Sequence, residues 1–191
     1  RFVGIDHSCA AIMVTIPTAQ AVVENMEHGP LIFNRSDLHS AFDEADRSYI
    51  AALEHRLLEA ADHVLYTSRA LMERERSLVG DRGVFLDHGV DVAQFVEHGP
   101  APADIVELPR PRVGFVGTVR DHVVDVDLVE RVATSIPSAS VVVVGDATTS
   151  VSHLNQLDNV YLLGQRPYES VPSYLAELDV GLLPFKRNEW I

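Results

Sequence analysis

The sequence is poor in cysteine and in long apolar runs: among its 191 residues, Cys9 is the only cysteine. A single cysteine cannot form a disulfide bond within the chain, and this scarcity is typical of proteins from reducing compartments. No segment approaches the roughly 20 consecutive apolar residues that a membrane-spanning helix needs. The chain begins at Arg1, and its first residues lack the pattern of a signal peptide. These absences predict a cytoplasmic protein without an integral membrane segment.

Positive charge is also scarce. Lys and Arg together number 15 against 28 Asp and Glu, which gives a net charge of −13. A general nucleic-acid-binding surface and a polybasic membrane-binding patch both need clustered positive charge. We therefore expect no nucleic-acid partner. An anionic ligand would have to be held by a local site, because the overall field would not attract it.

Several catalytic and metal-binding motifs are missing as well. The nine histidines include no pair at the spacing of a zinc site beside a glutamate, so we expect no bound metal. The sequence has no Gly-x-Ser-x-Gly elbow of a serine hydrolase and no phosphate-binding P-loop. Residues 114–117, Gly-Phe-Val-Gly, resemble part of a dinucleotide fingerprint, but its third glycine is absent.

Hydrophobic residues make up 47% of the chain, enough to bury a substantial core. Short β-branched runs alternate with amphipathic segments, a pattern that predicts parallel sheets with helical crossovers. Residues 97–108 lack clear periodicity and contain two prolines, which is typical of a linker. We expect an α/β protein with two doubly wound parallel sheets, in domains 1–93 and 110–191, joined by a linker at 94–109. The expected strands lie at 11–16, 31–33, 63–66, 84–86, 112–116, 140–144, 160–163 and 180–183.

Among the expected helices (19–26, 42–60, 69–78, 127–136 and 171–178), the longest follows the second strand. Its apolar residues recur at steps of three and four, which predicts an amphipathic helix from Phe42 to Ala60. Asp43, Glu44, Asp46 and Glu54 lie mostly off this apolar stripe, so we expect them on a solvated face. Ser68 is a favourable N-cap for the next helix.

The loops that follow the expected strands are the main candidates for ligand binding. Open parallel sheets bind ligands at the carboxyl ends of their strands. Glycine lets the backbone approach a ligand closely there, and an arginine such as Arg120 could hold a phosphate through its forked guanidinium. Each loop taken alone is equally consistent with ordinary turn chemistry. The five loops are residues 34–39, 87–91, 117–120, 145–146 and 164–168.

Six segments resemble retaining glycosyltransferases of the GT-B fold, of the large family four type. They occur in the order of that family and together span most of residues 30–185. The segments are residues 60–71 (AADHVLYTSRAL), 88–95 (HGVDVAQF), 112–118 (RVGFVGT), 141–146 (VVVVGD), 159–175 (NVYLLGQRPYESVPSYL) and 179–184 (DVGLLP).

The resemblance implies two Rossmann-like domains facing a cleft, and transfer of a sugar from a nucleotide-sugar donor to an acceptor hydroxyl with retention. It implies a glycan or lipid-linked acceptor and a role in polysaccharide or glycoconjugate synthesis. It implies no cofactor and no metal, since helix N-termini and cations neutralise the leaving diphosphate in such enzymes. It also implies a cytoplasmic location, and leaves open a peripheral contact with the inner face of the membrane.

The same resemblance implies particular site residues. Asp37, His39 and Glu189 are the catalytic candidates. The candidates for donor binding are Gly117, Thr118, Arg120, Gly145, Gly164, Gln165 and Tyr168. The chain departs from the family pattern at three points: Ser36 stands where a histidine often precedes Asp37, the lysine that usually accompanies Arg120 is not evident, and the chain stops at Ile191 before the second glutamate of the family's Glu–seven residues–Glu segment.

We therefore expect a chain that is incomplete at both ends relative to this family. Loss of the final helices predicts an exposed apolar face around residues 180–185. Two alternatives remain open from the sequence: a nucleotide-sugar epimerase of similar fold, and a non-catalytic relative that binds a nucleotide sugar.

Overall fold

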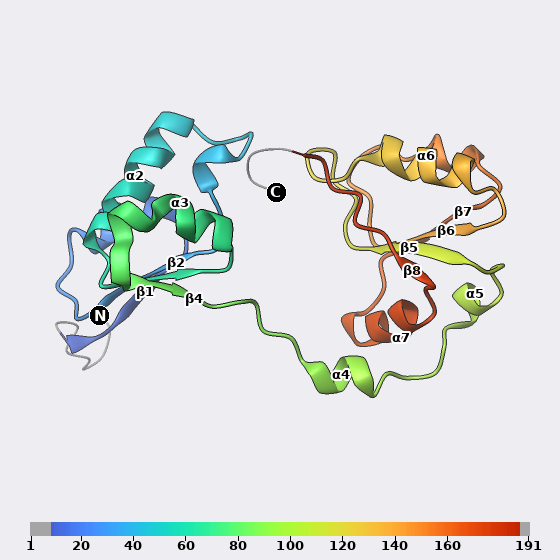
Figure 1. Cartoon of the computed structure of the whole chain (residues 1–191), viewed down its shortest axis with the longest axis horizontal. Coiled ribbons are helices and arrows are strands. Elements are labelled where there is room, and N and C mark those ends of the chain that lie inside the picture. Colours follow the sequence, from blue (N-terminus) through green and yellow to red (C-terminus); the bar gives the residue numbers. More distant parts are fainter. Residues whose placement is uncertain (1–8, 188–191) are drawn as a thin grey trace. The chain divides into compact units, whose positions relative to one another are not determined.

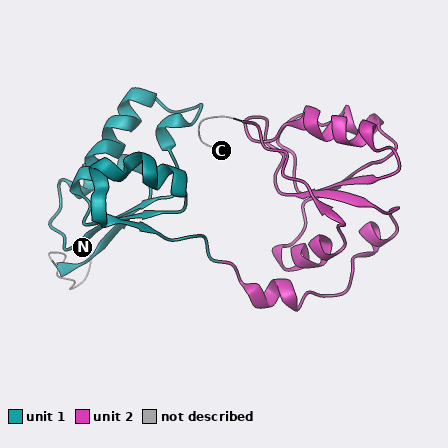
Figure 2. Cartoon of the chain, viewed as in Figure 1, with its two compact units in different colours: residues 1–89, 190 teal, residues 90–189, 191 magenta. Residues whose placement is uncertain are grey.

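The computed structural model describes residues 9–187 (Figure 1). The chain divides between Gly89 and Val90 into two compact units, which we call unit 1 and unit 2 (Figure 2). Each unit contains a four-stranded parallel sheet of its own. The α/β class and the two Rossmann-like sheets expected from the sequence are confirmed.

Unit 1 is built on the sheet β1-β2-β3-β4, whose strands follow one another in space as they do in the sequence. The strands are β1 (Ile12–Val14), β2 (Leu31–Arg35), β3 (His63–Tyr66) and β4 (Gly83–Phe85). Three helices connect them: α1 (Gln20–Val23), α2 (Arg47–Ala60) and α3 (Arg69–Val79). Because each crossover moves the chain in the same direction and crossovers are right-handed, all three helices pack on one face of the sheet.

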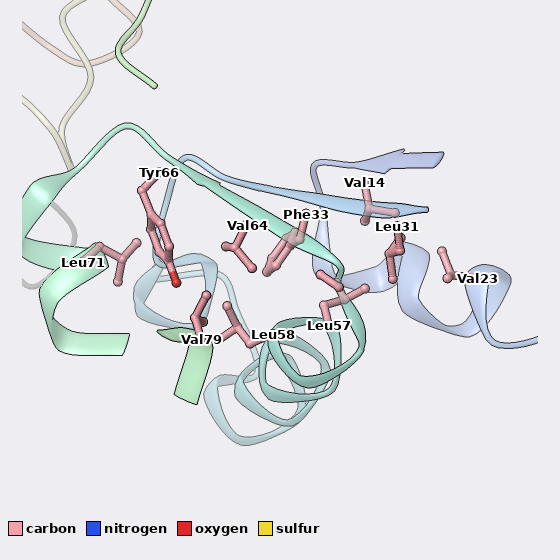
Figure 3. Close-up of a cluster of buried hydrophobic side chains, with 11 residues drawn as sticks. Val14, Val23, Leu31, Phe33, Leu57, Leu58, Val64, Tyr66, Leu71 and Val79 are labelled. Atoms are coloured by element: carbon pink, nitrogen blue, oxygen red, sulfur yellow. The ribbon is translucent and has the colours of Figure 1, made fainter. Parts of the chain in front are cut away.

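The core of unit 1 forms between this face and the helices. Phe33 and Val64 are fully buried, and they point from neighbouring strands toward Leu57 and Leu58 of α2 (Figure 3). On the opposite face, Met13 and Val84 are 57% and 43% exposed. Alternate residues of the strands therefore face the helices, as the period of two requires.

Helix α2 begins at Arg47, five residues later than the sequence pattern predicted. The side chain of Asp46 accepts a hydrogen bond from the backbone N–H of Tyr49 and caps the helix at that point. The preceding residues form a short 3-10 turn, η3 (His39–Ala41), instead. The expectation for Glu54 was also wrong, since it is 3% exposed and faces the core.

Unit 2 has the strand order β7-β6-β5-β8. Its strands are β5 (Arg112–Val116), β6 (Ser140–Val144), β7 (Val160–Gly164) and β8 (Val180–Gly181). Helix α6 (Val126–Ser135) packs on one face, while α5 (Ala103–Val106) and α7 (Val171–Ala176) pack on the other. The chain leaves β5 for β6 on one side and returns to β8 on the other, which creates the doubly wound pattern and a topological switch point beside β5.

Residues 94–109, which the sequence assigned to a linker, are grouped with unit 2. They carry the end of α4 (Val92–Val96) and all of α5. The buried guanidinium of Arg112 donates hydrogen bonds to the carbonyls of Val106 and Leu108, at 2.6 and 2.9 Å from Nη2. The side chain of Arg112 on β5 therefore attaches the backbone of this segment to the sheet. The irregular, proline-containing sequence of the segment does not reveal these contacts.

Candidate functional site

Unit 2 has a pocket at the carboxyl ends of β5, β6 and β7, next to the topological switch point. Its volume is about 360 Å³. This is the position at which doubly wound sheets bind ligands. The residues that line it are Val116, Gly117, Thr118, Arg120, Val144, Gly145, Asp146, Thr148, Gln165, Arg166 and Val171.

The backbone at this end of the sheet is held by hydrogen bonds between successive loops. Gly117 N–H donates to the carbonyl of Val144, and Gly145 N–H donates to the carbonyl of Gly164, each at 2.9 Å. Gly145 has a φ of 147°, and a Cβ added there would lie 2.0 Å from the carbonyl oxygen of Gly117. Only glycine allows the loops after β5 and β6 to approach this closely.

The charges that line the pocket are two arginines, Arg120 and Arg166, and one acid, Asp146. Arg120 is exposed. Arg166 is partly buried, and its Nε and Nη2 donate hydrogen bonds of 2.7 Å to the hydroxyl of Tyr174 and to Asp104. These two hydrogen bonds raise the pKa of Arg166 above its ordinary value. The pocket thus offers two guanidinium groups, which are suited to phosphate oxygens.

Five of the residues expected to bind the donor line this pocket: Gly117, Thr118, Arg120, Gly145 and Gln165. Gly164 instead lines a neighbouring apolar cavity of about 200 Å³ on the α6 side of the sheet, which shares Gly145 and Asp146 with the pocket.

Tyr168 is not among the lining residues. It is 58% exposed, and its ring contacts that of Phe95 at 6.5 Å between centroids. The sequence analysis missed Arg166, although it directly follows Gln165 in a loop already selected.

The catalytic candidates of unit 1 lie in the loop after β2, above a buried ion network. Arg35 is 1% exposed and pairs with Glu54 and with Glu75, whose Oε1 lies 2.9 Å from Nη2. Arg35 Nη1 also donates to the carbonyl of Asp37 at 2.6 Å, while Glu54 accepts a hydrogen bond from the backbone N–H of Ser40. The network therefore fixes the backbone on both sides of His39.

A tyrosine completes this network. The hydroxyl of Tyr66 donates to Glu75 at 2.8 Å. Burial, and then this hydrogen bond, raise the pKa of Tyr66, so the hydroxyl keeps its proton and acts as a donor.

His39 lines a second pocket, of about 390 Å³, at the carboxyl ends of β1 and β2. Most of its lining is apolar and includes Phe42, Tyr49 and Ile50. The Nδ1 atom of His39 is buried without a hydrogen-bond partner, and it lies 3.8 Å from Oε1 of Glu54. The carboxylate of Asp37 accepts a hydrogen bond of 2.9 Å from the hydroxyl of Ser36. The third catalytic candidate, Glu189, lies outside residues 9–187.

A group of potential metal ligands occurs elsewhere in unit 2. Asp127 and Glu130 of α6 and His153 bring ligand atoms to within 4.8 Å of one another. None of the three lines the pocket at the strand ends. Exposed groups of this kind are common without an ion, so the cluster does not assign a metal to the site.

The face expected to be apolar and exposed is present at the end of the described chain. Val180, Leu183 and Phe185 are 52%, 76% and 40% exposed. No helix within residues 9–187 is both long and apolar enough to cross a membrane.

Comparison with curated proteins gives a relative named as a glycosyltransferase. The chain is 28% identical over 168 residues to TuaH of Bacillus subtilis (strain 168), a protein provisionally named as a teichuronic acid biosynthesis glycosyltransferase. The match covers 83% of this chain and 41% of TuaH. No family model matches the sequence.

Solved structures share the fold. Anabaena Alr3699/HepE in complex with UDP superposes with a TM-score of 0.70 at 19% identity, over 90% of this chain and 52% of HepE. Sucrose-phosphate synthase (tll1590) from Thermosynechococcus elongatus gives a TM-score of 0.71 at 21% identity, over 93% of this chain and 51% of the synthase. The chain thus spans about half the length of the proteins it matches. The chain therefore shares the two-domain fold of these solved structures, and in sequence it is similar to TuaH.

Proposed function

We propose that this chain forms the donor-binding and acceptor-side parts of a glycosyltransferase. The enzyme transfers a sugar from a nucleotide-sugar donor to an acceptor hydroxyl with retention at the anomeric carbon. The pocket of unit 2 carries the proposal, because it combines glycine-lined strand ends and two arginines at a topological switch point.

In this proposal the pocket binds the nucleoside diphosphate of the donor. Arg120 and the amides that follow Gly117 and Gly145 contact the phosphate oxygens, and Gln165 lies beside the nucleotide base. As the bond between the anomeric carbon and the phosphate oxygen breaks, negative charge develops on the leaving diphosphate. Positioned amides and a guanidinium stabilise that charge without a metal ion.

The loop after β2 forms the acceptor side. The acceptor hydroxyl forms the new bond to the anomeric carbon and gives up its proton. Asp37 and His39 are the proposed groups for orienting that hydroxyl and handling the proton, with Glu189 as a third catalytic candidate. The largely apolar pocket beside His39 suits the apolar face of a glycan or the lipid of a lipid-linked acceptor.

Uridine nucleotides are the first donors to test. HepE is described in complex with UDP, with UDP and glucose, and with UDP-glucose. By its name, TuaH acts in the synthesis of a polysaccharide. We propose a UDP-sugar donor and a cytoplasmic role in polysaccharide or glycoconjugate synthesis, with a peripheral contact with the inner face of the membrane left open.

The experiment incubates the chain with radiolabelled UDP-glucose, and with other UDP-sugars, in the presence and absence of EDTA. Slow release of the sugar, or its transfer to an added glycan, supports the transferase. Because no metal is expected, EDTA should change neither rate. An epimerised donor would identify an epimerase, and tight binding without turnover would identify a non-catalytic relative.

Arg120→Ala tests the phosphate assignment separately, with isothermal titration of UDP as the measurement. A charge-assisted hydrogen bond of this kind is worth roughly 1.5–3 kcal/mol, so the dissociation constant should rise about tenfold or more. Arg131→Ala is the matched control, because Arg131 lies on α6, is 62% exposed and is not among the lining residues. An unchanged dissociation constant for Arg120→Ala would remove Arg120 from the donor site.

A further inference from the structure

We propose that Arg166 binds an anionic group of the nucleotide in the pocket of unit 2. We also propose that Asp104, which lies between β4 and β5 in the sequence, is a positioning residue for Arg166. The inference rests on the proposed donor site. It adds a binding residue and makes the segment once assigned to a linker part of the site.

The guanidinium of Arg166 is oriented by three groups. Its Nη2 donates to Oδ2 of Asp104 at 2.7 Å, its Nε donates to the hydroxyl of Tyr174 at 2.7 Å, and its Nη1 donates to the carbonyl of Gln165 at 3.2 Å. The hydroxyl of Tyr174 in turn donates to Asp104 at 3.0 Å. Tyr174 is 4% exposed, so it supports Arg166 from the interior, while the side chains of Arg166 and Asp104 are 30% and 38% exposed.

This arrangement leaves part of the guanidinium available to a ligand. A guanidinium has five N–H donors in a fixed plane. The three contacts use one hydrogen on each nitrogen, which leaves one N–H on Nη1 and one on Nη2. Arg166 lines the pocket together with Arg120, and an oriented guanidinium loses little entropy when it binds a phosphate.

Unlike the residues that line the pocket, Asp104 belongs to α5, outside the loops at the strand ends. Its segment is attached to the loop after β7 and to α7 at further points. Gln94 Nε2 lies 3.5 Å from the carbonyl of Tyr168, and the hydroxyl of Ser173 donates to the carbonyl of Gly99 at 3.2 Å. Binding of a nucleotide to Arg166 should therefore also stabilise residues 97–107, since coupling between two sites is reciprocal.

The experiment measures UDP and uridine binding by isothermal titration for the full chain and for Arg166→Ala, Asp104→Asn and the double variant. Losing a charge-assisted hydrogen bond corresponds to about tenfold or more in affinity. Arg166→Ala should weaken UDP binding by about that factor and leave uridine binding nearly unchanged. Asp104→Asn should weaken UDP binding several-fold alone and have no further effect in the Arg166→Ala background, because its role acts through that side chain.

The controls separate a positioning role from loss of the fold. Asp158→Asn and Arg131→Ala repeat the Asp-to-Asn and Arg-to-Ala changes at residues of unit 2 that do not line the pocket. Both variants should bind UDP like the unmodified chain. As a second readout, cleavage after Glu107 by a glutamate-specific protease should slow when UDP is added, and this protection should be lost in Arg166→Ala.

The outcomes distinguish this inference from the function on which it rests. If the unmodified chain binds no nucleoside diphosphate, the proposed donor site fails. If it binds UDP but Arg166→Ala binds equally well, Arg166 is not a ligand-binding residue. If Asp104→Asn binds UDP more tightly, Asp104 does not position Arg166. The same conclusion follows if Asp104→Asn weakens UDP binding by the same factor in the unmodified chain and in Arg166→Ala.

Discussion

Replacement of Arg35 by methionine should remove a large part of the stability of unit 1. The guanidinium is 1% exposed and faces two carboxylates, of Glu54 and Glu75, whose side chains are 4% and 11% exposed. Removing one partner of a buried ion pair costs about 3–5 kcal/mol, because a charge is left uncompensated. Here two acids lose their partner, so we expect a loss in the upper part of that range. The free energy of unfolding of a whole small domain is about 5–15 kcal/mol.

The loss should come from uncompensated charge, and a combined variant tests this. In Arg35→Met with Glu54→Gln and Glu75→Gln, neutral amides of similar size replace both acids. Because buried ion pairs gain little over well-packed neutral groups, the triple variant should recover at least half of the lost free energy. The hydrogen bond from Tyr66 to Glu75 keeps an acceptor in the amide.

The assay is urea unfolding followed by hydrogen exchange, with peptides from β2 and β3 reporting on unit 1. Unit 2 serves as an internal reference, because separate units need not unfold in one transition. Arg76→Met is the matched control: its side chain on α3 is 74% exposed and lies 3.5 Å from Glu73, so the change should stay within about 0.5 kcal/mol. The reasoning is refuted if Arg35→Met is no worse than Arg76→Met, or if the triple variant is no better than Arg35→Met.

Three further changes test unit 2. Gly145→Ala places a methyl group 2.0 Å from a backbone carbonyl at a φ of 147°, which costs about 1–3 kcal/mol for the dihedral angle alone, and UDP binding should be lost in the same titration. The carboxylate of Asp125 caps α6 by accepting a hydrogen bond of 2.8 Å from the backbone N–H of Leu128. Asp125→Ala removes this cap and should lower the free energy of unfolding, measured in urea melts, by about 1 kcal/mol. Burial opposes ionisation of Asp104, but hydrogen bonds from Arg166 and Tyr174 outweigh it and lower its pKa. Because the folded pKa lies below the unfolded value, this contribution is present above about pH 4 and lost as the pH falls further, so the protection factors of residues 98–108, which correct hydrogen exchange for its intrinsic dependence on pH, should fall there; unchanged protection factors would contradict it.

Much of the sheet architecture could be predicted because it depends on local patterns. The strands expected at 63–66, 112–116 and 140–144 form at those residues, since runs of β-branched residues in buried parallel strands are distinctive. Ser68 caps α3 through the N–H of Leu71, as its position before an amphipathic segment predicted. Residues expected to bind the donor in the loops after β5 and β6, namely Gly117, Thr118, Arg120 and Gly145, line one pocket, because strand ends are recognisable in sequence.

The failures concern residues whose role depends on distant partners. Glu54 was placed on a solvated face because a charged residue is normally exposed, whereas Arg35, nineteen positions earlier in the chain, pairs with it in the interior. The pattern of the segment 94–109, which we expected to be a linker because its prolines interrupt any period, likewise does not indicate its contacts within unit 2. Its attachment depends on Arg112 and on the Asp104 contact with Arg166, which no spacing in the sequence indicates.

The sequence by itself determined the α/β class, the two parallel sheets, the order of their strands along the chain and the loops that follow the strand ends. These follow from hydrophobic periodicity and turn chemistry, which act over a few neighbouring residues. Only the tertiary structure decided which loops meet in one pocket, which arginine is buried and which acids form ion pairs with it. Those outcomes depend on strand order in space, the side of the sheet on which each crossover packs, and charge pairing between distant segments, and these are properties of the folded chain.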